Sequence, residues 1–237
     1  MNTNKRSTSD RILQMIPGLI TWSVLLSPII LARPLPNVVA FFIPFVTDFC
    51  VYRAFVHSVG MIIGYRKYKK FAEINWLERF QQIDRSTLPD QDSLPDDLND
   101  LKHLVLTPTV DESLSVLGGT FAGVDKQTFP LDKVYYVITT EEKYHRQTQE
   151  IVETMKEKYP ELKNVWVFVH PAGLDGEVQG ASSNRTWGAK RAVEKLQSMG
   201  ENIDNFLVTT MDGDAVLSEQ YLSLLAYEYV LKEDRRD

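Results

Sequence analysis

The stretch "FLVTTMDGDAVLSEQYL" at residues 206–222 joins an apolar strand pattern to a pair of carboxylates. The β-branched and apolar run at 206–211 ends at two aspartates, Asp212 and Asp214, which are separated only by Gly213. A helical pattern follows at 218–231, where Ser218 is a residue type that caps helix starts. Two like charges directly after a buried strand repel each other unless a cation or a hydrogen-bonding ligand lies between them. The stretch therefore predicts a strand, a binding site and a helix in succession.

Three more strand patterns precede this stretch, and helical patterns separate them. The predicted strands are 103–109, 134–140, 165–170 and 206–211, and the predicted helices are 113–123, 142–158, 185–199 and 218–231. Such alternation builds a mainly parallel sheet flanked by helices, which is an α/β, Rossmann-like fold. The nearly continuous apolar strands are typical of a sheet that is buried on both faces.

Acidic side chains follow the ends of the predicted strands. Asp111 and Glu112 come after the first strand, Glu141 and Glu142 after the second, and the two aspartates after the fourth. Because ligands of open α/β sheets bind at the carboxyl ends of the strands, these carboxylates are expected to gather at one edge. Hard oxygen ligands select Mg²⁺ or Mn²⁺, which usually keep substrate phosphates in their coordination shell. The pattern therefore favours a divalent cation that carries a diphosphate.

Three segments together resemble the family 2 glycosyltransferases of the GT-A fold, in particular the membrane-anchored processive type. They are "TPTVDE" (107–112), "GEVQGASSNRTWGAKRAV" (176–193) and "TTMDGDAVLSEQYLSLL" (209–225), and the resemblance covers roughly residues 103–231. It implies a nucleotide-sugar donor, most simply a UDP-sugar, and a carbohydrate or lipid-linked acceptor. The implied reaction extends a polysaccharide or glycolipid with the help of Mg²⁺ or Mn²⁺.

The resemblance also implies roles for particular residues. Pro108, Asp111 and Glu112 would contact the nucleotide, Asp212 would face the ribose or the diphosphate, and Asp214 would ligate the metal. The glycine-containing segment after the third strand adds a further set of donor-binding positions: Gly176, Gly180, Ser183 and Asn184.

The chain departs from the family pattern in two places. An aspartate-rich turn usually follows the second strand, where this chain has Glu141 and Glu142, and Ala181 stands where the family often has a lysine. The family's general base and its aromatic–arginine acceptor motif lie well downstream of the Asp-X-Asp motif. With Asp237 as the last residue, the resemblance implies an amino-terminal part of a longer enzyme, with the base unidentified.

Other interpretations of the same residues remain open. The Asp-Gly-Asp triplet is also common in loop turns, the glycines also serve turns, and Asn184 is also a suitable helix cap. An apolar strand before Asp-X-Asp also fits a phosphatase of the haloacid dehalogenase type, with Asp212 as nucleophile and Asp214 as general acid. An inactive, membrane-bound binder of nucleotide sugars is the third alternative.

The chain divides by charge into a basic, apolar front and an acidic back. Residues 1–70 contain 9 Lys and Arg against 2 Asp and Glu, although the whole chain has a net charge of −6. The predicted organisation is a membrane anchor at 1–70, a proline-containing linker at 71–100 with a short helix near 71–83, and the α/β domain at 101–237. The acidic domain argues against nucleic acid as a partner. The lone cysteine, Cys50, excludes an internal disulfide bond.

Two apolar segments predict a transmembrane hairpin. Residues 12–32 contain no charged residue, and residues 38–65 are long and apolar but include Asp48, Arg53 and His57. Basic residues precede the first segment and follow the second, so both ends are expected in the cytoplasm and the 32–37 turn outside. The alternatives are a signal peptide for the first segment and an interfacial helix for the second.

Overall fold

The computed structural model describes residues 8–174, 177 and 180–232. Contacts divide the chain into two compact units, Met1–Phe71 and Ala72–Asp237.

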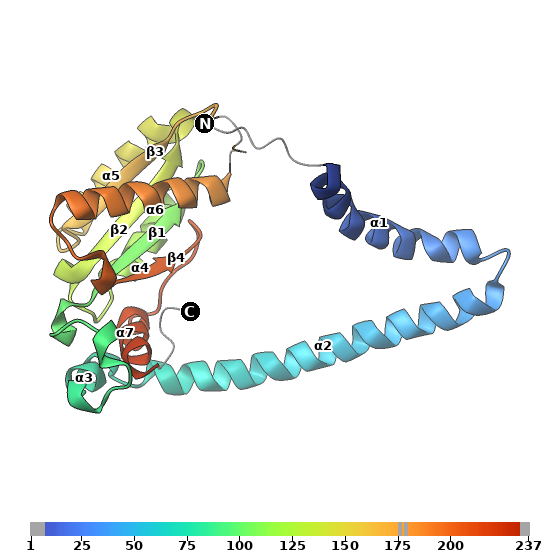
Figure 1. Ribbon diagram of the computed structural model, residues 1–237, viewed down its shortest axis with the longest axis horizontal. Coiled ribbons are helices and arrows are strands. Elements are labelled where there is room, and N and C mark those ends of the chain that lie inside the picture. Colours follow the sequence, from blue (N-terminus) through green and yellow to red (C-terminus); the bar gives the residue numbers. More distant parts are fainter. Residues whose placement is uncertain (1–7, 175–176, 178–179, 233–237) are drawn as a thin grey trace. The chain divides into compact units, whose positions relative to one another are not determined.

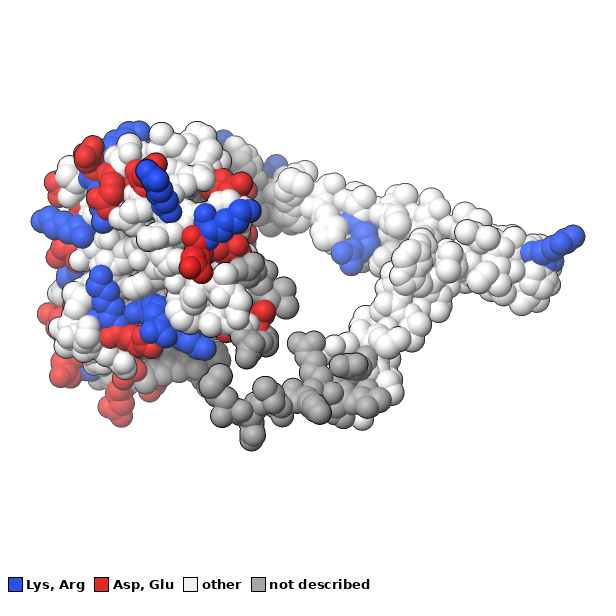
Figure 2. All heavy atoms as spheres, turned by 90° about the horizontal axis from the view of Figure 1, so that it is seen from above, with Lys and Arg blue, Asp and Glu red and all other residues white. Residues whose placement is uncertain are grey.

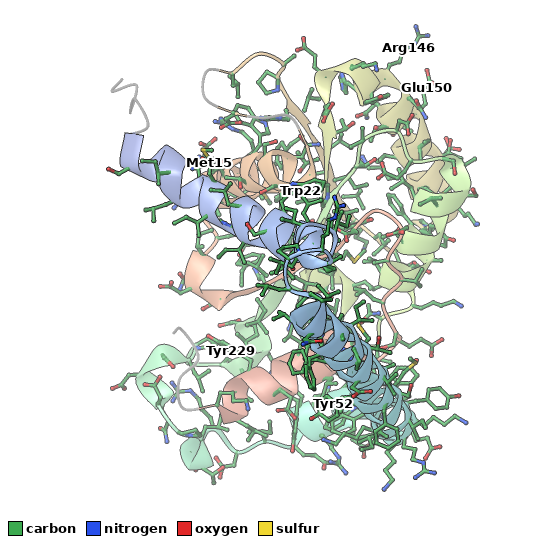
Figure 3. All side chains as sticks on the ribbon, turned by 90° about the vertical axis from the view of Figure 1, so that its right-hand side faces the viewer. Met15, Trp22, Tyr52, Arg146, Glu150 and Tyr229 are labelled. Carbon is green, nitrogen blue, oxygen red and sulfur yellow. The ribbon has the colours of Figure 1, made fainter. Side chains whose placement is uncertain are left out.

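The amino-terminal unit consists of two long helices, α1 (Thr8–Leu31) and α2 (Pro36–Ala72). Both are long and apolar enough to cross a membrane. At 1.5 Å per residue, the 37 residues of α2 extend roughly 55 Å, well beyond a hydrocarbon core of about 30 Å. Large apolar side chains lie exposed along both helices, among them Met15, Trp22 and Tyr52 (Figure 3). The helix α1 covers the first predicted span except for its last residue, Ala32, and α2 includes the second span and continues through the basic residues after position 65.

The second unit is built on a four-stranded, all-parallel sheet (Figure 1). The strands are β1 (Lys102–Pro108), β2 (Val134–Glu141), β3 (Asn164–His170) and β4 (Phe206–Thr210), arranged in the order β3-β2-β1-β4. Each lies within one residue of its predicted bounds. The predicted α/β class with a parallel sheet is therefore confirmed.

Helices cover both faces of the sheet (Figure 1). The helix α6 (Ala181–Ser198) packs its Ala192 and Leu196 on Leu104 and Leu106 of β1. The helices α4 (Leu114–Asp125), α5 (His145–Lys158) and α7 (Tyr221–Leu231) form a larger core with the other face. Alternate residues of β1 thus enter different clusters, as the two-residue period of a strand requires.

The start of α7 differs from the prediction. The helix begins at Tyr221 rather than at Ser218, so Ser218 does not cap it. Gln127, just after α4, instead supplies a cap from outside: its Oε1 accepts from the Leu222 backbone N–H at 3.0 Å, and its Nε2 donates to the Ser218 carbonyl at 2.7 Å. A side chain distant in sequence therefore replaces the local cap, which local sequence rules do not anticipate.

The segment predicted as a linker packs against the domain. It contains the helix α3 (Trp76–Gln81) and several apolar side chains that enter the core, namely Trp76, Phe80, Leu88, Leu94 and Leu98. Trp76 contacts Tyr227 of α7, with ring centroids 5.2 Å apart. The predicted helix near 71–83 is divided between the end of α2 and α3. Short 3₁₀ helices lie at Arg85–Thr87, Gln91–Ser93, Leu98–Asp100, Leu131–Lys133, Glu142–Tyr144 and Ile203–Asn205.

Charged side chains of both signs are distributed over the visible face of the α/β unit (Figure 2). On the solvent side of α5, for example, Arg146 pairs with Glu150 four residues later, at 3.2 Å (Figure 3). Such exposed pairs contribute little to stability.

Candidate functional site at the carboxyl edge of the sheet

The parallel register brings the first and last acidic motifs to the same edge of the sheet. Pro108, at the end of β1, pairs with Thr139, and Leu106 pairs with Thr210 at the end of β4. Beyond these pairs, the Met211 N–H still donates to the Leu106 carbonyl at 2.9 Å. The loops that carry Asp111 and Asp214 therefore leave neighbouring strands at the carboxyl edge, as predicted.

The Glu112 side chain connects these two loops. Its Oε2 accepts from the Val110 N–H at 2.6 Å and from the Thr109 hydroxyl, so the carboxylate folds back over its own loop. A Cβ placed on Gly213 would lie 3.0 Å from Glu112 Oε1, which shows how closely the carboxylate lies against the Asp-Gly-Asp turn. The side chain organises the edge, while the neighbouring Asp111 is exposed.

Hydrogen bonds hold the backbone of the Asp-Gly-Asp turn, while its two carboxylates are exposed to solvent. The buried Thr120 hydroxyl of α4 donates to the Gly213 carbonyl at 2.8 Å, and the Ala215 N–H donates to the Asp212 carbonyl at 3.0 Å. The side chains of Asp212 and Asp214 are both exposed. The backbone of the turn is therefore fixed and its carboxylates face solvent, where a ligand can reach them.

The first turn of α6 lies against the same edge. Gly180 precedes the helix with a φ of 153°, a backbone conformation that favours glycine. Asn184 is fully buried, and its Nδ2 donates to the Thr109 carbonyl at 3.3 Å. Since α6 begins at Ala181, Asn184 lies inside the helix, so the interpretation of Asn184 as the helix cap is wrong. Its role is to fasten the helix to the end of β1.

A close approach farther along α6 fixes the helix over β2. A Cβ on Gly188 would lie only 1.9 Å from the Thr139 hydroxyl oxygen, so only glycine fits there without a shift. With Asn184 bound to the end of β1 and Gly188 against β2, the start of α6 has little freedom relative to the carboxylates. Ser183, also in this turn, donates from its hydroxyl to the Gly180 carbonyl at 2.9 Å.

The loops after β2 and β3 form the other side of the edge. Glu142 Oε2 accepts from the Ala172 N–H at 3.0 Å and so ties the two loops together. The Tyr144 hydroxyl and, more weakly, the carboxylates of Asp111 and Glu141 raise the pKa of Lys143, which is exposed. Lys143 thus remains a cation beside the acidic residues.

The structure brings most of the predicted site together. Residues at or beside the carboxyl edge are Pro108, Asp111, Glu112, Gly180, Ser183, Asn184, Asp212 and Asp214. The predicted position Gly176 lies outside the described residues. Sequence reasoning missed Arg185, whose NH2 group lies 3.1 Å from Asp212 Oδ1. The available signal was a cation directly after Asn184, at the start of a helix aimed at an acidic edge.

The donor atoms suit a hard divalent cation that is shared with a ligand. Among the described residues, no group of three or more His, Cys, Asp or Glu side chains is arranged to hold a metal ion. Mg²⁺, however, is commonly bound by one or two carboxylates together with substrate phosphates and water. The exposed carboxylates of Asp212 and Asp214 match that chemistry when a diphosphate completes the shell.

Neither a protein-family model nor a curated protein matches this chain.

Proposed function

We propose that the chain is a membrane-anchored glycosyltransferase of the GT-A type, which uses a nucleotide-sugar donor and Mg²⁺ or Mn²⁺ to extend a polysaccharide or glycolipid. The observation that carries the proposal is the meeting of Glu112 with the Asp-Gly-Asp turn at the carboxyl edge of a parallel sheet. In open α/β sheets this edge binds the ligand. Two acidic motifs about a hundred residues apart thus contribute to one exposed surface.

The roles follow from position along this edge. Asp111 and the loop after Pro108 would contact the nucleoside, while Asp212 and Asp214 would hold the metal–diphosphate group. The metal would neutralise charge on the leaving diphosphate as a Lewis acid. Asn184 and Glu112 would keep the walls of the site in register, since one binds the end of β1 and the other lies against Gly213. An acceptor hydroxyl would be the nucleophile and needs a carboxylate base.

The membrane anchor supports an acceptor that is linked to a lipid or exported across the membrane. We propose that α1 and α2 both span, with the α/β unit in the cytoplasm, because basic residues flank the pair and only Arg33 lies in the turn. A variant with Cys50→Ser and Pro36→Cys should react with an impermeant thiol reagent from outside intact cells. Labelling only after lysis would contradict the hairpin.

The donor site is tested by calorimetry on the detergent-solubilised chain, with a panel of UDP- and GDP-sugars and Mn²⁺. Asp214→Asn should abolish metal-dependent binding and leave the melting temperature unchanged, because an exposed carboxylate beside a like charge contributes little stability. Asp204→Asn, an exposed aspartate just before β4 and so at the opposite end of the sheet, is the matched control. Unchanged binding in Asp214→Asn would make that residue structural.

A second measurement separates the proposed transferase from the alternatives. Membranes containing the chain are given a radiolabelled nucleotide sugar, and both polymer-bound label and free phosphate are measured. Metal-dependent incorporation supports transfer. Phosphate release that depends on Asp212 as nucleophile would replace the proposal with a phosphatase. Donor binding without turnover is expected both of a binding protein and of the amino-terminal part of a longer transferase, and label incorporation by an extended chain would separate the two.

A further inference from the structure

Arg185 provides a positive charge beside an otherwise acidic edge. Its guanidinium NH2 group lies 3.1 Å from Asp212 Oδ1, and its side chain is 37% exposed while that of Asp212 is 74% exposed. Arg185 therefore reaches across from α6 to the Asp-Gly-Asp turn and remains accessible from solvent.

The backbone below Arg185 is firmly placed. The preceding residue, Asn184, is fully buried and bound to the Thr109 carbonyl, and Gly188 lies against Thr139 one turn later. The guanidinium thus starts from a rigid element, which is the arrangement that precise ligand recognition needs.

The pair with Asp212 uses only part of the guanidinium's hydrogen-bonding capacity. An arginine carries five N–H donors in a planar fork. The structure gives one hydrogen bond, from NH2 to Asp212, and Nε is buried without a hydrogen-bond partner among the described residues. The Arg185 side chain is 37% exposed, so its other N–H groups can bind an anionic oxygen, which is the strongest partner of a charged donor.

Stability does not account for the pair. Exposed ion pairs contribute little to stability, because solvent screens them and both side chains lose freedom. Held against Asp212, however, the guanidinium stays beside the carboxylates that would carry a metal–diphosphate group. The fork of an arginine matches phosphate oxygens in a way that a lysine cannot.

We propose that Arg185 binds the diphosphate of the nucleotide donor and that Asp212 holds its guanidinium ready for this contact. The inference rests on the proposed function, since it names the group that recognises one part of the donor. The accessible N–H groups on the terminal nitrogens take the non-bridging phosphate oxygens, while one N–H keeps its bond to Asp212. The affinity that Arg185 adds should therefore grow with the number of phosphates in the ligand.

The test is the binding of uridine, UMP and UDP, each with Mn²⁺, to the full chain in detergent. Arg185→Gln should weaken UDP binding by about 10- to 100-fold, which is the effect of one or two charged hydrogen bonds. The affinity for UMP should fall by a smaller factor, and the affinity for uridine should not change. Arg185→Lys should fall between Arg185→Gln and the wild type, because it keeps the charge and loses the fork.

Arg191→Gln is the control for the loss of a cation from the same helix. Arg191 pairs with Glu194 at 2.7 Å and lies over the Trp187 ring, and neither of these contacts involves Asp212. Its replacement should leave all three affinities unchanged. Melting temperatures of every variant show whether the domain remains folded.

The outcomes separate the two proposals. If the wild-type chain binds none of the three ligands and no sugar of the UDP and GDP panel, the proposed function fails and the role of Arg185 fails with it. If the wild type binds UDP and Arg185→Gln weakens uridine, UMP and UDP equally, or none of them, only the inference about Arg185 is overturned. A loss that increases from uridine to UDP supports it.

Discussion

The two units of this chain place the same kinds of side chain in opposite environments. Leucine, isoleucine, valine and phenylalanine line the exposed surface of α1 and α2, whereas in the α/β unit most of them enter two buried clusters. The large apolar residues described as exposed in that unit are few: Leu114, Met199, Val208, Val216 and Leu231. Exposed apolar surface on the scale of α1 and α2 is typical of a lipid-facing segment, and both helices are long and apolar enough to cross a membrane.

Glycine shows the same contrast. A Cβ on Gly60 or Gly64 of α2 would meet nothing within 4 Å, whereas one on Gly123 would approach the Leu217 backbone nitrogen to 2.9 Å. In the α/β unit, glycine permits helices and loops to pack closely. In α2 no such contact with the residues that the structure describes requires it.

Of the paired substitutions, an arginine introduced into each unit should give the largest difference in free-energy cost between the two units. Leu19 in α1 is 58% exposed and Met199 at the end of α6 is 53% exposed, so exposure alone predicts equal tolerance. In a membrane span, Leu19→Arg costs about 2.5–3.5 kcal/mol of insertion. Met199→Arg should be neutral, because a cation suits a helix carboxyl end. A glycosylation reporter in the 32–35 turn measures insertion, and full insertion of Leu19→Arg would contradict a lipid-facing α1.

Alanine in place of glycine should give the next largest effect. Gly188→Ala places a Cβ 1.9 Å from the Thr139 hydroxyl oxygen, so α6 or β2 must move. Overpacking of this kind costs about 1–3 kcal/mol, and we expect the upper end, seen as a lower melting temperature. Thr139→Ala should partly rescue it. Gly60→Ala in α2 should cost nothing, and an equal loss there would reveal a packed partner for that helix.

Periodicity predicted the strands well because each is a continuous apolar run between turn residues. The carboxyl-edge rule then placed Asp111 and Asp214 together, since parallel pairing leaves no other arrangement. What the sequence could not supply were contacts between distant residues. The cap that Gln127 provides for α7, the bond from Asn184 to Thr109 and the pair between Arg185 and Asp212 all depend on tertiary packing.

The segment at 71–100 is a second case in which the local sequence did not predict tertiary contacts. Its prolines and aspartates are typical of a linker, and the local pattern contains no long periodic run. Its leucines are spaced for separate insertions into a core, so Leu88, Leu94 and Leu98 enter it through short turns rather than along one helix face. Composition predicts the irregular backbone of such a segment but not which of its side chains are buried in the core.

A third prediction concerns pH and the buried His103 of β1. Burial lowers the pKa of its imidazole from 6.5 to about 3. The imidazole lies edge-on to the Phe129 ring, with the two ring centroids 4.5 Å apart. Between these pKa values the unfolded chain binds a proton that the folded chain does not. The free energy of unfolding should therefore fall as pH falls below 6.5, by roughly 1.4 kcal/mol per pH unit, or about 2 kcal/mol at pH 5.

The window between pH 5 and 6.5 separates the effect of His103 from that of Glu201. Glu201, whose pKa the Lys102 ammonium lowers, loses its contribution only below its ordinary pKa of 4.5. His103→Leu should flatten the pH dependence in denaturant titrations followed by Trp76 and Trp166 fluorescence. A slope that persists in His103→Leu would assign it to another group of the α/β unit.

The smallest expected effect joins the fold to the candidate site. Gly213→Ala brings a Cβ to 3.0 Å from Glu112 Oε1, so the carboxylate must yield by a few tenths of an ångström against its bonds to Val110 and Thr109. Alanine also restricts the unfolded chain, which stabilises by about 0.4–1 kcal/mol where the native backbone permits it. The two effects should nearly cancel in the wild type. In a Glu112→Ala background the contact is gone, so Gly213→Ala should stabilise by that amount. The double-mutant cycle therefore measures the coupling between the two loops, and a coupling of zero would mean that Glu112 does not hold the Asp-Gly-Asp turn.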